Sequence, residues 1–172
     1  MGPSDRQFPE FFAGQYGPLR RLGFLLTGDW AQAEELAQET LVRVWWRWPL
    51  VRRQRHPEAY ARKVLVNRHR SLLRRLRLEA RHAGRGEPEP VADPGSREEL
   101  LVVRAAIRRL PPRQRAVLVL RYHEDLPEQE VARLLRVPLG TVKSTTNRAL
   151  ARLRRDLAGQ LPDRTGSERT PR

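Results

Sequence analysis

The stretch PEQEVARLLRVPLGTVKSTTNRALARLRRDL, residues 127–157, decides the fold of the second half of this chain. Its first part, residues 127–135, predicts a short helix with one apolar side, and residues 137–140 predict a tight turn. Thr141 is then expected to cap a helix that runs to about Leu157. Two helices joined by a short glycine-containing turn, the second of them basic, are typical of a helix-turn-helix.

The second of these helices carries side chains suited to DNA. Residues 131–155 include seven basic residues and no acidic one. Polar side chains in the first turns of such a helix reach base edges in the major groove. We therefore expect DNA contacts from Thr141, Lys143, Ser144, Thr145, Asn147 and Arg148. The alternative is an ordinary helical hairpin with a solvated basic face.

The charge of the whole chain favours a polyanionic partner. The 172 residues carry a net charge of +14, and only Lys63 and Lys143 among the 34 basic residues are lysine. This excess favours DNA, RNA or an acidic membrane surface as the partner. A GC-rich genome would also produce the arginine bias. The absence of cysteine excludes disulfides, thiol catalysis and cysteine-ligated zinc.

Hydrophobic periodicity predicts helices throughout, and no stretch shows the alternation of a strand. Asp29 is expected to cap a helix whose apolar face continues to Trp48, and Pro49 is expected to stop it. Tyr60, Trp45 and Trp48 follow the apolar spacing and are expected in the core, whereas Trp46 lies off that face. The predicted fold class is all-α, with two small helical domains.

A change in composition separates these two domains. Residues 86–99 are acidic on balance and rich in proline and glycine, which is typical of a flexible linker. The predicted organisation is a first domain at 8–78, a flexible linker at 79–97, a second domain with the helix-turn-helix at 98–157, and a disordered tail at 158–172.

Motifs in both halves resemble one family. In the second half, LPPRQRAVL at 110–118 and GTVKS at 140–144 resemble region four of extracytoplasmic-function sigma factors, most closely the actinobacterial kind. In the first half, AEELAQET at 33–40 and PEAYARKVLVN at 57–67 resemble region two of the same family. The resemblance covers roughly residues 8–157. It implies an alternative sigma factor that binds core RNA polymerase, recognises promoter DNA and initiates transcription.

The resemblance also assigns roles to residues of the first half. Region two of the family binds the clamp helices of RNA polymerase through its second helix, which implies a polymerase-binding set of Glu35, Leu36, Gln38, Glu39 and Arg43. The alternative for these acids is a solvated helix face favoured by the helix dipole. The minus-ten element would be held by Arg62, Lys63, Asn67, Arg68 and Arg70. Asn67 matches the family residue of the base pocket, and a polar helix interruption or cap is its alternative.

The remaining expectations concern partners and chemistry. The second domain is expected to read the minus-thirty-five element and to contact the polymerase flap. An anti-sigma factor, if the chain has one, would cover the polymerase surface between the domains. We expect a cytoplasmic protein that is monomeric when free, with no membrane insertion, no cofactor, no metal and no enzymatic activity. The competing hypothesis is a stand-alone helix-turn-helix regulator that binds a palindrome as a dimer.

Overall fold

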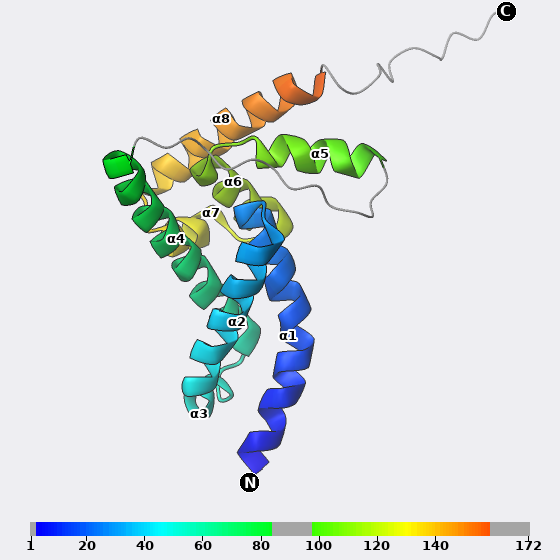
Figure 1. Cartoon of the computed structure of the whole chain (residues 1–172), viewed down its shortest axis with the longest axis vertical. Helices are drawn as coiled ribbons and strands as arrows, with labels where there is room; N and C mark the ends of the chain where they lie inside the picture. The colour runs from blue at the N-terminus through cyan, green and yellow to red at the C-terminus, as the bar shows by residue number, and fades with distance from the viewer. Residues whose placement is uncertain (1–2, 84–97, 159–172) are drawn as a thin grey trace, which may run out of the picture.

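The computed structural model of the chain describes residues 3–83 and 98–158, and all regular structure within these ranges is helical (Figure 1). The predicted all-α class is confirmed. The first half contains four helices: α1 (Pro3–Thr27), α2 (Trp30–Trp46), α3 (Trp48–Val51) and α4 (Pro57–Ala83). The second half contains α5 (Glu98–Arg108), α6 (Pro112–Leu118), the π-helical segment η1 (Val119–His123), α7 (Glu128–Leu135) and α8 (Leu139–Ala158).

The junction between α1 and α2 forms as the sequence predicts. Gly28 has a φ of +79°, a left-handed conformation that is easily adopted only by glycine. Asp29 is the N-cap of α2, and its carboxylate accepts a hydrogen bond from the backbone N–H of Gln32 at 2.8 Å. This bond satisfies one of the free N–H groups of the first turn, so a local signal is enough to end one helix and begin the next.

The packing of α1 on α2 depends on a second glycine. A Cβ atom at Gly23 would lie 3.1 Å from the Cα and carbonyl oxygen of Ala33, which is closer than side chains normally approach backbone. The absence of a side chain at Gly23 therefore lets the two helices come together, and they share the most extensive packing in the described structure.

The tryptophans divide between core and surface in a way that corrects one prediction. Trp48 is buried and Tyr60 packs against the core, as expected. Trp45 is 45% exposed, because it lies at the edge of α2 and rests on Phe8 with ring centroids 4.7 Å apart. Trp46 is 81% exposed. The expectation of a core position for Trp45 was therefore wrong.

The helix-turn-helix forms with different turn chemistry from that predicted. The left-handed residue that ends α7 is Arg136, with a φ of 52°, and Gly140 lies inside α8. Thr141 is the third residue of α8 and not its cap, since the backbone N–H of Thr141 already donates to the carbonyl of Pro138 at 2.9 Å. The predicted cap and turn glycine were wrong because α8 begins at Leu139, three residues before the start expected after a cap at Thr141.

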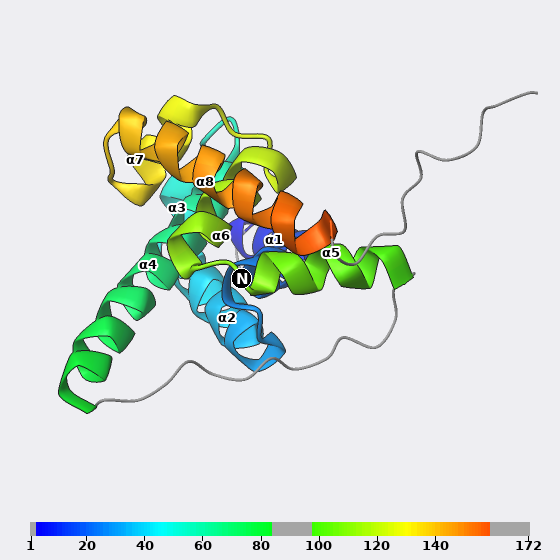
Figure 2. The same cartoon turned by 90° about the horizontal axis from the view of Figure 1, so that it is seen from above.

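The two halves pack on each other, in what we call the closed arrangement. One hydrophobic cluster contains Leu26 and Leu65 of the first half together with Val117 and Leu120 of the second. Helix α1 contacts α6, and α4 contacts α7. Seen from above, α8 lies across α6 (Figure 2).

Helix α4 continues to Ala83, so residues 79–83 are helical and not part of a linker as predicted. The rest of the predicted linker, 84–97, and the tail from 159 lie outside the described residues.

Candidate nucleic-acid interface

Helix α8 presents the predicted minus-thirty-five residues on its outer face. Val142, Thr146 and Ala149 are buried against the rest of the second half. Because residues three and four positions apart share a helix face, the intervening polar residues point outward together. Of the predicted residues, Lys143, Ser144, Asn147 and Arg148 are exposed, and Thr141 and Thr145 are half-buried.

Within this outer face, Arg148 is held along the helix. Its Nε donates to the carbonyl of Ser144 and its Nη2 contacts the Ser144 hydroxyl, both at 3.2 Å. The guanidinium is therefore oriented before any ligand binds.

Helix α4 carries the predicted minus-ten residues, and several of them are engaged inside the chain. Arg68 forms an ion pair with Glu39 of α2. Arg62 forms an ion pair with Glu124, which follows η1 in the second half. Arg70 donates to the carbonyl of Leu134 in α7 at 3.3 Å. In the closed arrangement these three guanidinium groups therefore have protein partners, whereas Lys63 is exposed.

The predicted polymerase-binding residues all lie on α2, and all but Leu36 are at least partly exposed. Glu35, Gln38 and Arg43 are exposed, and Glu39 is half-buried beside Arg68. Leu36 is only 5% exposed, because it lies on the side of α2 that faces the core. It lines a groove together with Glu35 and Glu39, and its part in polymerase binding stays a prediction.

Two apolar residues extend this surface of α2 and were missed in the sequence. Val42 is 54% exposed and Trp46 is 81% exposed. They are four residues apart, and Val42 is four residues after Gln38, so all three share one face. The sequence signal that could have found Val42 and Trp46 was their spacing from the acidic residues of α2, which places them outside the buried apolar face of this helix.

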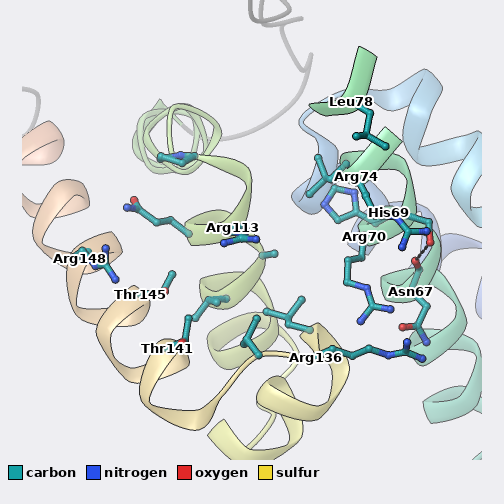
Figure 3. Close-up of a pocket in the computed structure, with 18 residues that line it drawn as sticks. Asn67, His69, Arg70, Arg74, Leu78, Arg113, Arg136, Thr141, Thr145 and Arg148 are labelled. Atoms are coloured by element: carbon teal, nitrogen blue, oxygen red, sulfur yellow. Dashed lines mark hydrogen bonds between the residues drawn. The ribbon is translucent and has the colours of Figure 1, made fainter. Parts of the chain in front are cut away.

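The closed arrangement brings the two predicted DNA sites to opposite walls of one cleft. This cleft has a volume of about 960 Å³ and lies between α4 and the segment from α6 to α8 (Figure 3). Asn67 and Arg70 line it from α4, and Thr141, Thr145 and Arg148 line it from α8. The sequence predicted each set, but not that the two sets would face each other.

A buried histidine lies in the α4 wall. His69 is 3% exposed, and neither ring nitrogen has a hydrogen-bond partner. Burial, with a further contribution from the positive charge of Arg115, lowers the pKa of His69 to about 4. The imidazole is therefore neutral at physiological pH.

No cluster of three or more His, Asp or Glu side chains suited to a metal ion occurs in residues 3–83 and 98–158. Within the same ranges, no helix is both long and apolar enough to cross a membrane.

Comparison with known proteins identifies the family. Models of sigma-70 region 2 and sigma-70 region 4 match residues 13–79 and 100–153. The RNA polymerase sigma-E factor of Streptomyces coelicolor is 32% identical over 167 residues, which cover 96% of this chain and 94% of that protein. The ECF RNA polymerase sigma factor RpoE of Cereibacter sphaeroides is 33% identical over 90% of this chain and 88% of its own length. The chain belongs to the extracytoplasmic-function sigma factors.

The fold agrees with this assignment. The sigma factor RpoE from Bartonella quintana, solved with the anti-sigma factor NepR, superposes with a TM-score of 0.72 at 24% identity, covering 91% of this chain and 99% of that one. As an extracytoplasmic-function sigma factor, the chain binds core RNA polymerase, recognises promoter DNA and initiates transcription. This function is favoured over that of a stand-alone regulator. Sigma factors are regulatory proteins and not enzymes.

Proposed function

We propose that three helices of this sigma factor divide the work of initiation. Helix α2 docks on the polymerase clamp, α4 holds the opened minus-ten element, and α8 reads the minus-thirty-five element as duplex. The observation that carries this proposal is the outer face of α8, where four of the predicted residues are exposed together while Val142, Thr146 and Ala149 of the same helix are buried. A helix with one exposed polar face and one buried face can enter the major groove while its buried face stays packed in its own domain.

The polymerase-binding surface combines charge with an apolar centre. Glu35, Gln38 and Arg43 supply polar contacts, and Val42 and Trp46 supply apolar area on the same face of α2. Tryptophan is enriched among the residues that dominate binding energy at protein interfaces. An 81% exposed tryptophan on a soluble helix is best explained by a protein partner that covers it.

The minus-ten contacts require the closed arrangement to open. Arg62 and Arg70 point to partners in the second half, so they become available to DNA only when α4 separates from η1 and α7. The apparent affinity of a ligand falls with the fraction of protein in the competent state. We therefore propose that the closed form is a resting state and that polymerase and promoter together select the open form.

The remaining partners follow from the family. NepR is named as an anti-sigma factor bound to the related RpoE, and we propose that an anti-sigma factor also binds this chain. The second domain, spanning 98–157, would contact the polymerase flap. The protein would act in the cytoplasm as a monomer when it is free. The chain between the domains would raise the effective concentration of each site for the other.

Runoff transcription with core polymerase tests the proposal. The wild-type chain is expected to give a promoter-specific product, and the double variant Glu35→Lys, Gln38→Lys is expected to lose core binding while duplex binding stays unchanged. Glu130→Lys is the control, because it reverses a partly exposed acid on α7, away from α2. Unaltered core binding by the α2 double variant would remove α2 from the polymerase interface.

A further inference from the structure

The cleft between α4 and the second half has an unusual chemical lining. It is formed by 18 residues. None of these described residues is an aspartate or a glutamate, whereas five are arginines: Arg70, Arg74, Arg113, Arg136 and Arg148. In Figure 3, Arg70 extends from α4 and Arg136 from the turn between α7 and α8 into the same region. A concave surface of this composition attracts anions.

The positive charge inside the cleft is not balanced by the lining residues. Burial lowers the pKa of Arg70, and the charges of Arg136 and Arg74 lower it further. Like charges that are held together disfavour their own ionised forms. A bound anion would reverse this repulsion, and phosphate suits the bidentate geometry of guanidinium groups.

Unpartnered polar atoms on both walls of the cleft indicate that the ligand also has hydrogen-bonding groups. His69 lines the cleft and is only 3% exposed. Neither of its ring nitrogens has a hydrogen-bond partner. A neutral imidazole offers one donor and one acceptor. The Oε1 atom of Gln114 is also buried in this lining without a partner and can accept a further hydrogen bond.

The rest of the lining is apolar. Leu73, Val117, Leu135 and Val137 contribute hydrophobic surface to the cleft. Its volume of about 960 Å³ lies in the range of small-molecule sites, which occur preferentially where two domains meet. Inorganic phosphate alone would use neither the apolar surface nor the unpartnered amide and imidazole.

We propose that this cleft binds a nucleotide with two or more phosphates, held by Arg70, Arg74 and Arg136, with its base between the apolar surfaces of the two walls, which carry His69 on α4 and Gln114 on α6. The site exists only while the two halves are together, since its walls come from both. A ligand that binds one state stabilises that state by mass action. The nucleotide therefore favours the closed arrangement and opposes promoter binding.

Calorimetry on the full chain tests this site, with adenosine and guanosine triphosphates as probes. We expect saturable binding of one nucleotide per chain, weaker binding of tripolyphosphate, and weaker binding still of the nucleosides. Arg74→Gln and Arg136→Gln are each expected to lower the affinity about tenfold, the effect of one charge-assisted contact. The matched control is Arg154→Gln on the exposed end of α8, outside the cleft, which removes the same charge and should leave binding unchanged.

A second measurement uses the arrangement of the two halves. The chain has no cysteine, so Ala31→Cys and Ala151→Cys, both at exposed positions, allow a donor and an acceptor dye to report the distance between halves. Nucleotide is expected to increase the closed population. The proposal is overturned if the Arg154→Gln control loses as much affinity as the cleft variants, if only an oligothymidylate binds saturably, or if nucleotide leaves the closed population unchanged.

Discussion

The ion pair between Arg62 and Glu124 offers a direct way to open the closed arrangement. It joins α4 to the segment after η1, so it exists only while the halves are together. Replacing Glu124 by Gln keeps the shape of the side chain and removes its charge. We expect this variant to shift the equilibrium toward the open form and to free Arg62 for DNA.

The magnitude follows from the burial of the pair. Exposed ion pairs contribute about 0.2–1 kcal/mol, and breaking a fully buried pair costs about 3–5 kcal/mol. The side chains of Arg62 and Glu124 are 30% and 12% exposed, which places this pair between the two limits. A value of about 2 kcal/mol corresponds to a change of about 30-fold in the ratio of closed to open chains.

The dye pair at positions 31 and 151 measures this change. The closed population should fall in Glu124→Gln, and the affinity for single-stranded minus-ten DNA should rise by up to about 30-fold, as the competent fraction increases. Glu130→Gln is the control, because it removes one acid from an ion pair with Arg133 inside the second half. Equal effects of the two variants would show that only net charge matters. An unchanged closed population in Glu124→Gln would refute the idea that the Arg62–Glu124 ion pair holds the two halves together.

Three further outcomes are expected. Trp46→Ala should weaken core polymerase binding by about 30-fold in a co-sedimentation titration, as for a central interface residue worth about 2 kcal/mol. The melting temperature of this variant should stay within a degree or two of wild type, since the Trp46 ring is 81% exposed. Arg148→Ala should weaken minus-thirty-five duplex binding and reduce the salt slope by about 1, and an unchanged affinity would exclude this contact. The closed arrangement should be fully stable above pH 6.5 and lose up to about 3 kcal/mol as the pH falls toward 4, because the pKa of His69 drops from 6.5 to about 4. Dye-pair measurements against pH should show this loss in the wild type and not in His69→Phe.

Local features of the fold could be predicted because neighbouring residues produce them. Asp29 caps α2 through a residue three positions away, and the apolar spacing of α8 separates Val142, Thr146 and Ala149 from the exposed face. Local signals are less able to predict the residue at which a helix ends. Arg136 adopts the left-handed conformation that ends α7, although a glycine lies only a few residues further on.

Prediction of the site was uneven for the same reason. The polar face of α8 and the acidic face of α2 follow from helix periodicity, so their exposed residues were found in the sequence. Trp45 was misplaced because the width of a buried stripe depends on what packs against it. Trp45 rests on Phe8 of α1, but 45% of its surface stays exposed.

The sequence by itself determined the all-helical fold class and the family, and it predicted the two sets of DNA-binding residues, since all of these depend on periodicity and short motifs. Only the tertiary structure decided that the two sets face each other, that Arg62 meets Glu124, and that Arg70 donates to Leu134 across 64 positions of the chain. Contacts at such separation arise from the packing of whole helices, and no spacing of residues along one helix encodes them.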